Sequence, residues 1–176
     1  MTRQHIIPQP GFQAMFLSSP ADIAIGGGSA GAGKSFALLL EPLRHAGVPG
    51  FRAVIFRRTT VQVKNSGGLW DTSKEIYSGL RNDADEAPQA TEAPPRWKFP
   101  SGATLLFSHL EHEHTKLDWD GSQIALLGFD ELIHFTSGQF WYLVGRNRSA
   151  CGVKPYVRAT TNPQTSGWVK RLIEWW

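Results

Sequence analysis

Residues 28–35 read Gly-Ser-Ala-Gly-Ala-Gly-Lys-Ser, and this stretch decides the fold. It matches the Walker A pattern, in which Gly28 and Gly33 enclose four variable residues ahead of Lys34 and Ser35. Glycines let successive backbone N–H groups approach phosphate oxygens that side chains would keep away. A helix starting near Lys34 adds its N-terminal N–H groups and the positive end of its dipole. The pattern predicts a phosphate-binding loop for ATP.

The side chains of this loop have distinct expected roles. Lys34 should reach the β- and γ-phosphates, which also makes it a predicted catalytic residue. The hydroxyl of Ser35 should ligate Mg²⁺, a hard cation that prefers oxygen. The predicted nucleotide-binding residues of the loop are Gly28, Ser29, Ala30, Gly31, Ala32, Gly33, Lys34 and Ser35.

Short apolar runs alternate with amphipathic stretches on both sides of the loop. This alternation predicts an α/β fold: a three-layer P-loop NTPase of the ASCE or RecA-like kind, with a mainly parallel central sheet flanked by helices. The acidic, proline-containing segment 82–95 predicts a solvated connection, and 100–102 a hairpin turn. The expected strands are 21–25, 51–56, 97–99, 103–107, 123–129 and 156–160, and the expected helices are 34–44, 69–80, 139–144 and 168–175.

An acidic pair, Asp130-Glu131, follows the apolar run 124–129. A buried strand ending in Asp-Glu has the form of a Walker B motif. Its tip would place Asp130 beside the phosphate loop to hold Mg²⁺, and Glu131 to orient and deprotonate the attacking water. A glutamate at this position is typical of motor and helicase ATPases, not of kinases or GTPases.

A second polar motif, Thr160-Thr161-Asn162-Pro163, follows the next expected strand. Polar groups at the carboxyl end of a strand face the nucleotide crevice in open α/β sheets. We therefore predict that Thr161 and Asn162 sense the γ-phosphate by hydrogen bonding. An ordinary Asn-Pro turn is the alternative.

Phosphoryl transfer also needs positive charge for its transition state. Arg57 and Arg58 end the second expected strand on the crevice side and are the predicted catalytic arginines; Arg146 and Arg148 suit a neighbouring subunit or DNA better. Gln13 precedes the loop strand, and its amide could read the adenine edge with a donor and an acceptor together. A surface glutamine is the alternative there.

Composition and short sequence patterns bear on nucleic-acid binding, membrane insertion, disulfides and metal sites. The net charge of +3 and the pI of about 9.2 permit contact with nucleic acid without demonstrating it. No apolar stretch is long enough to span a membrane, and the N-terminus has no signal-peptide pattern. The single cysteine, Cys151, excludes an internal disulfide. The histidines around 109–114 match no zinc-binding spacing and predict a solvated stretch.

These motifs together resemble the N-terminal packaging ATPase domain of the large terminase subunit of tailed phages. The order and spacing hold over nearly the whole chain, and Phe-Asp-Glu-Leu followed by Thr-Thr-Asn-Pro is the most particular part. The resembling segments are 21–23 with 26–35, 55–59, 121–123, 128–132 with 134–135, 146–149 and 159–163.

The resemblance implies a motor that hydrolyses ATP to move double-stranded DNA into a procapsid in the cytoplasm of a bacterial host. It implies a homo-oligomeric ring on the portal protein, with a small terminase subunit as partner and no membrane. It also implies that Gln13 contacts adenine and that Thr160 to Asn162 couple hydrolysis to motion. Some relatives carry an arginine within the loop, where this chain has Ser29, Ala30 and Ala32.

The family's C-terminal nuclease domain has no counterpart in residues 1–176, which we expect to be a P-loop ATPase domain incomplete at its C-terminus and without nuclease activity. Two alternatives remain at this point. One is a DNA-dependent ATPase of the helicase or recombinase kind, although we find none of the further DNA-contacting motifs that helicases need. The other is a truncated nucleotide-binding module with little activity.

Overall fold

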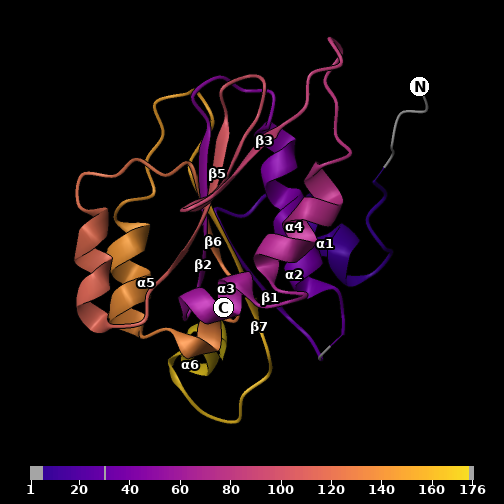
Figure 1. The fold of residues 1–176 in the computed structure, drawn as a ribbon. Helices are drawn as coiled ribbons and strands as arrows, with labels where there is room; N and C mark the ends of the chain where they lie inside the picture. The colour runs from indigo at the N-terminus through magenta and orange to yellow at the C-terminus, as the bar shows by residue number, and fades with distance from the viewer. Residues whose placement is uncertain (1–5, 30, 175–176) are drawn as a thin grey trace.

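A computed structural model describes residues 6–29 and 31–174. These residues form one mixed sheet with helices on both of its faces (Figure 1), which confirms the predicted three-layer α/β fold. The strands are β1 Ile23–Gly27, β2 Arg52–Arg57, β3 Gln89–Glu92, β4 Pro95–Lys98, β5 Thr104–His109, β6 Leu126–Phe129 and β7 Tyr156–Thr161. The α-helices are α1 Phe12–Ser18, α2 Lys34–Leu40, α3 Thr60–Lys64, α4 Leu69–Tyr77, α5 Ser137–Val144 and α6 Trp168–Glu174, and the 3-10 helices are η1 Glu41–His45, η2 Glu113–Trp119 and η3 Leu132–His134.

The strand order in this sheet is β1-β7-β6-β2-β5-β4-β3. The first five strands of this order are parallel to one another, and β4 and β3 extend the sheet as antiparallel strands. The carboxyl ends of β1, β7, β6 and β2 therefore lie along one edge, where the motifs of the sequence come together.

Two hydrophobic cores lie on opposite faces of the sheet. Alternating side chains of β2 enter different cores, because successive residues of a strand point to opposite faces: Ile55 joins one and Phe56 the other. Helices α1, α2 and α4 pack in the first core, and α5 and α6 in the second (Figure 1). Strand β6, an interior strand between β7 and β2, is buried along its whole length, as its unbroken apolar run indicates.

Several predicted boundaries differ from the structure. Helix 34–44 ends as α-helix at Leu40 and continues as η1, because Pro42 has no N–H for an i→i−4 hydrogen bond. Helix 69–80 ends at Tyr77. Helix 139–144 begins at Ser137, where Thr136 and Gln139 form a capping box. The last predicted helix, 168–175, is described as far as Glu174.

The prediction of a solvated connection over 82–95 is wrong in its second half, where β3 forms and β4 begins. Every residue of β3 is exposed, so apolar alternation could not mark it as a strand. Pairing with β4 at the sheet edge makes it a strand, and Glu92 ties it to helix α4 through a hydrogen bond from Trp70 Nε1 of 2.7 Å. The hairpin predicted at 100–102 does connect the antiparallel strands β4 and β5.

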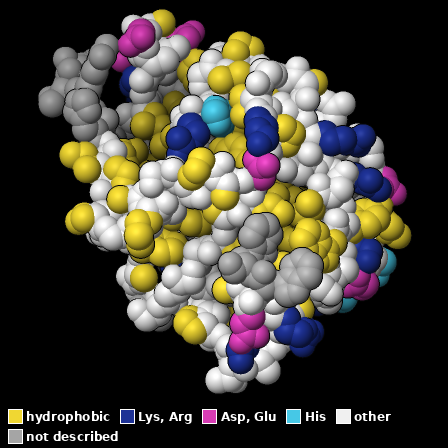
Figure 2. Space-filling view, turned by 180° about the vertical axis from the view of Figure 1, so that it is seen from behind, with side chains coloured by type: hydrophobic (Ala, Val, Ile, Leu, Met, Phe, Trp, Pro, Cys, Tyr) yellow, Lys and Arg dark blue, Asp and Glu magenta, His cyan; other side chains and the backbone are white. Residues whose placement is uncertain are grey.

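One face of the molecule carries its charges in a dispersed pattern. On the face in Figure 2, lysine and arginine side chains stand in separate groups, with hydrophobic and acidic side chains between them. Within 6–29 and 31–174, no helix combines the length and apolar character that crossing a bilayer requires.

Candidate nucleotide site at the carboxyl edge of the sheet

The phosphate loop lies between the end of β1 and the start of α2. Gly31 and Gly33 take positive φ angles of 80° and 66°, conformations that favour glycine. Gly33 is the N-cap of α2, so the chain turns from loop to helix immediately before Lys34. The predicted site residue Ala30 lies outside the described residues. The strand–loop–helix context that the Walker A pattern requires is thus present.

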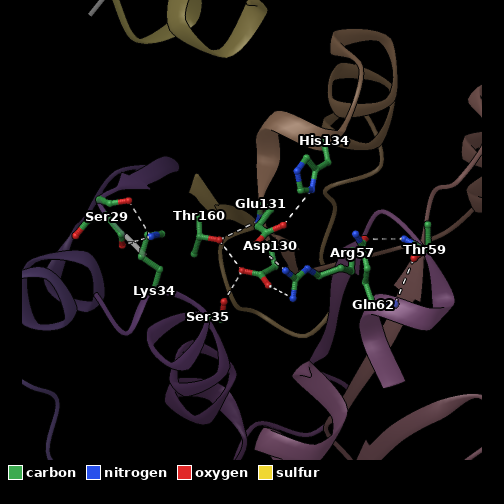
Figure 3. Close-up of polar contacts among 11 residues, drawn as sticks. Ser29, Lys34, Ser35, Arg57, Thr59, Gln62, Asp130, Glu131, His134 and Thr160 are labelled. Carbon is green, nitrogen blue, oxygen red and sulfur yellow. Dashed lines mark hydrogen bonds and ion pairs between the residues drawn. The ribbon is translucent and has the colours of Figure 1, made fainter. Parts of the chain in front are cut away.

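Lys34 lies across this loop. Its Nζ donates to the carbonyl oxygens of Gly28, at 2.8 Å, and Ser29, at 2.6 Å (Figure 3). The ammonium group is therefore held at the mouth of the loop, where a phosphate oxygen could replace either carbonyl as acceptor.

Asp130 is the centre of the contacts between the motifs. It is 0% exposed, and its Oδ1 accepts hydrogen bonds from the hydroxyls of Ser35, at 2.8 Å, and Thr160, at 2.6 Å. Ser35 lies in α2, Asp130 directly follows β6 and Thr160 lies in β7. Ser35 and Thr160 are 125 residues apart in the sequence. The phosphate loop, the acidic pair and the threonine motif therefore meet at one carboxylate.

Glu131 occupies a constrained position next to Asp130. Its backbone is left-handed, with φ 57° and ψ 60°, which is uncommon for a residue other than glycine. Its backbone N–H donates to Thr160 Oγ1 at 3.1 Å. Its carboxylate contacts Arg57 Nη2 through Oε1 at 2.7 Å and His134 Nδ1 through Oε2 at 3.0 Å (Figure 3). Both oxygens of the predicted base are therefore in contact with a neighbour.

Arg57 bridges the acidic pair. Its Nη1 lies 3.1 Å from Asp130 Oδ2 while Nη2 contacts Glu131, so one guanidinium faces both carboxylates. It approaches from the opposite side to Ser35 and Thr160 (Figure 3). Arg58, the other predicted catalytic arginine, is not brought to this cluster: its Nη1 donates to Leu110 O at 2.8 Å and Gln139 Oε1 at 3.0 Å.

Neighbouring side chains of the threonine motif have different partners. Thr160 faces Asp130, whereas the neighbouring Thr161, 3% exposed, donates to the carbonyl oxygen of Asn162 at 3.2 Å. The structure brings Thr161 and Asn162 near the end of β1, where Gly27 pairs with Thr161, but gives neither a contact with the acidic pair. Their predicted part in sensing the γ-phosphate stays a prediction.

The structure places the remaining candidates as follows. The Gln13 amide lies against the phosphate loop and donates to Gly33 O at 3.2 Å. Arg146 pairs with Asp120 at 2.6 Å, and Arg148 donates to Ser122 O at 3.2 Å, both away from the acidic pair. Two contacts were not assigned from the sequence: Thr160 was not among the nucleotide-binding residues, and His134 had no role, although its i+3 spacing from Glu131 could have indicated one.

The oxygen atoms around Asp130 fit a magnesium ion. A carboxylate and two hydroxyls lie together, and Mg²⁺ is usually held by one or two carboxylates plus substrate phosphates, not by an all-protein cage. Within residues 6–29 and 31–174, no group of three or more His, Cys, Asp and Glu side chains is placed to hold a metal ion. His112 and His114 stack on one another with ring centroids 5.4 Å apart.

Comparisons with known proteins agree with these motifs. A family model described as the N-terminal part of the T4likevirus-type terminase large subunit matches residues 25–176. The comparison with curated protein sequences gave no match. Among solved structures, the HK97 bacteriophage large terminase is similar with a TM-score of 0.67 and 15% identity, over 97% of this chain and 38% of that chain.

Two further phage proteins share the fold. The large terminase ATPase domain of Thermus phage P74-26 has a TM-score of 0.61 and 15% identity, over 93% of this chain and 68% of that chain. A large terminase from a thermophilic bacteriophage, in complex with ATP-gamma-S, has a TM-score of 0.58 and 19% identity, over 92% of this chain and 41% of that chain. The chain thus spans well under half the length of this last protein and of the HK97 large terminase.

Proposed function

We propose, for a chain that belongs to the family of terminase large subunit N-terminal domains, that its nucleotide site hydrolyses ATP to drive double-stranded DNA into a procapsid. The observation that carries this proposal is the meeting of Ser35, Asp130 and Thr160 through hydrogen bonds of 2.8 and 2.6 Å. Each of these residues belongs to a different motif. A site that binds Mg²⁺ and the γ-phosphate is built from such separate motifs.

The loop residues and Lys34 would bind the phosphates, and Ser35 and Asp130 would hold Mg²⁺. The bound ion would neutralise charge on the phosphate oxygens. Lys34 donates to two carbonyls at the mouth of the loop, and phosphate oxygens would replace them as acceptors. Thr161 and Asn162 stay our candidates for sensing the γ-phosphate.

Glu131 would act as general base toward the attacking water. A carboxylate has about four lone-pair sites, so contacts with Arg57 and His134 leave room for a hydrogen bond from water. Arg57 would hold the Glu131 carboxylate in place through their direct contact. Of the two adjacent arginines we assign the catalytic role to Arg57, because Arg58 is engaged with Leu110 and Gln139.

The similar phage proteins support nucleotide binding. The large terminase of the thermophilic bacteriophage is described in complexes with ADP and with ATP-gamma-S. We extend this to the present chain: ATP is its substrate and Mg²⁺ its cofactor. We also propose that residues 1–176 act as the ATPase domain, without nuclease activity, in a homo-oligomeric ring on a portal protein. The small terminase subunit and double-stranded DNA would be its further partners in the host cytoplasm.

The test is phosphate release from Mg-ATP by the chain, with and without double-stranded DNA. Glu131→Gln removes the proton acceptor while keeping shape, and we expect its rate to fall about 10²–10⁴-fold. The matched control is Glu111→Gln at an exposed glutamate, which should release phosphate at the parent rate. Undiminished release by Glu131→Gln would remove Glu131 as base. No release by the parent under either condition would overturn hydrolysis by this domain.

A further inference from the structure

His134 contacts the proposed base, Glu131, through both its side chain and its backbone. Its Nδ1 lies 3.0 Å from Glu131 Oε2 (Figure 3). Its backbone N–H donates to the carbonyl oxygen of Glu131 at 2.9 Å. Both contacts span the 3-10 helix η3, whose N-cap is Glu131. The imidazole is therefore tied to the residue three positions before it.

The turn that carries His134 is anchored by buried neighbours. Leu132 and Phe135 are both buried and both belong to the second hydrophobic core. The carbonyl oxygen of Phe135 also accepts a hydrogen bond from Trp168 Nε1 of α6 at 2.7 Å. Because residues on either side of His134 are held in this way, the imidazole has a defined position although its side chain is 40% exposed.

The two oxygens of the Glu131 carboxylate have different partners. Arg57 Nη2 contacts Oε1 at 2.7 Å, and His134 Nδ1 contacts Oε2. The terminal torsion of a glutamate is broad, so a contact at one oxygen leaves the plane of the carboxylate free to rotate. Contacts at both oxygens fix that plane. Arg57 divides its guanidinium between Glu131 and Asp130, whereas the Nδ1 of His134 is directed at Glu131.

The contact assigns a proton to one nitrogen of the imidazole. An ionised carboxylate only accepts hydrogen bonds, so Nδ1 has to carry the hydrogen that it donates to Glu131. Both the neutral Nδ1–H tautomer and the imidazolium provide this donor. Since a carboxylate has about four lone-pair sites, one hydrogen bond at each oxygen leaves others for a water molecule. The imidazole can thus orient Glu131 without blocking its action as a base.

We propose that His134 is a positioning residue for the general base: its Nδ1–H fixes the orientation of the Glu131 carboxylate toward the attacking water. The part that concerns hydrolysis rests on the proposed function, whereas the hydrogen bond itself can be tested without nucleotide. The phosphates would be bound by the loop 28–35 with Lys34. Loss of the His134 donor should therefore slow turnover and leave the affinity for nucleotide unchanged.

The first test identifies the protonated ring nitrogen of His134 by ¹⁵N NMR of the nucleotide-free chain. The His134 signals are assigned by their loss in His134→Phe. At about pH 9, where imidazoles are neutral, the parent should show the Nδ1–H tautomer. Glu131→Met removes the acceptor and should increase the Nε2–H form, because the hydrogen bond selects the tautomer. An Nε2–H ring in the parent, or an unchanged tautomer in Glu131→Met, would overturn the proposal.

The second test compares phosphate release from Mg-ATP by two variants of His134. His134→Phe keeps an aromatic ring without a donor, and its kcat should fall about tenfold, as loss of a hydrogen bond to a charged group predicts. His134→Asn places an amide N–H near the position of Nδ1 and should recover most of this loss. His114→Phe, the same change at an exposed histidine of η2, is the matched control and should release phosphate at the parent rate.

Titration calorimetry with Mg-ATP separates positioning of the base from general damage, and circular dichroism melts check that each variant is folded. The affinity of His134→Phe should stay within about twofold of the parent affinity. Equal losses of kcat in His134→Phe and His134→Asn, or faster release by His134→Phe, would contradict the proposal. If the parent released no phosphate, the proposed function would fail, and the NMR experiment would still decide whether His134 holds Glu131.

Discussion

Arg57 is the residue on which the charge balance of the site depends. Asp130 is 0% exposed, and the side chain of Arg57, 17% exposed, is its partner at Oδ2. Removing one member of a buried ion pair leaves the other charge uncompensated, which costs more than the pair contributes. The guanidinium therefore compensates the buried charge of Asp130 in the folded state and also contacts Glu131, the proposed base.

We predict that Arg57→Met lowers the free energy of unfolding by about 2–4 kcal/mol, because the carboxylate of Asp130 stays buried without its cation. Urea denaturation measures this change. Adding Asp130→Asn should recover part of the loss, since the uncompensated charge is then removed as well. Arg52→Met, at the exposed start of β2, is the matched control and should change little. Equal stability of Arg57→Met and the parent would refute the account.

The sequence identified the residues of the site more reliably than the direction in which each side chain points. The pair Arg57-Arg58 and the motif Thr160–Asn162 were both identified. Consecutive residues at the end of a strand point to opposite sides, so only one of each pair of neighbours faces the site. Which one faces it depends on the register of β2 and β7 in the sheet, which one sequence does not contain. Arg57 and Thr160 proved to be the ones that reach Asp130.

Helix α1 packs closely against β1, the strand that leads into the phosphate loop. It lies on β1 through Phe12 and Phe16, and Gly26 is what lets the rings come so close. Gly26 does not have a positive φ, so its absent side chain matters here and not its backbone freedom.

We predict that Gly26→Ala destabilises the fold by about 1–3 kcal/mol, because the new methyl group forces α1 away from β1. Chemical denaturation followed by tryptophan fluorescence measures the change. Gly27→Ala is the matched neighbour: its Cβ would meet Thr161 Cγ2 at 3.8 Å, an ordinary contact, and stability should stay close to that of the parent. A Gly26→Ala protein as stable as Gly27→Ala would contradict this packing.

The elements that the sequence missed are short or exposed. Helix α1 has seven residues, too few to establish a helical period, and β3 has four residues that are all exposed and leave no apolar alternation. The central strands were found because burial on both faces requires an unbroken apolar run, as in β6. Tertiary pairing, which a local pattern does not encode, decides the elements at the edge of the sheet.

The order of the strands in the sheet brings together motifs that are far apart in the sequence. The sheet order places β7 between β1 and β6, so Thr160 lies between the phosphate loop and the acidic pair. Alternating strands and helices predicted the mainly parallel sheet, but the order of its strands follows only from the assembled structure. The antiparallel strands β4 and β3 lie at the far end of the sheet from β1, the strand that leads into the phosphate loop.

One face of the molecule shows how its charges are distributed. On the face in Figure 2, lysine and arginine side chains stand in separate groups and form no continuous basic patch. The chain spans 38% of the HK97 large terminase, and movement of DNA stays a proposal for the present chain. Nucleotide binding is the first step of the proposed function and can be tested directly on residues 1–176.

Titration calorimetry of the chain with Mg-ATP is the most direct test of the central claim that the loop 28–35 is an ATP site. We expect saturable binding of one nucleotide per chain. Lys34→Ala should weaken it at least about tenfold, since it removes a charged hydrogen bond to phosphate. Lys98→Ala, at an exposed lysine of β4, should bind as the parent does. No saturable binding by the parent, or equal affinity in Lys34→Ala, would contradict the account.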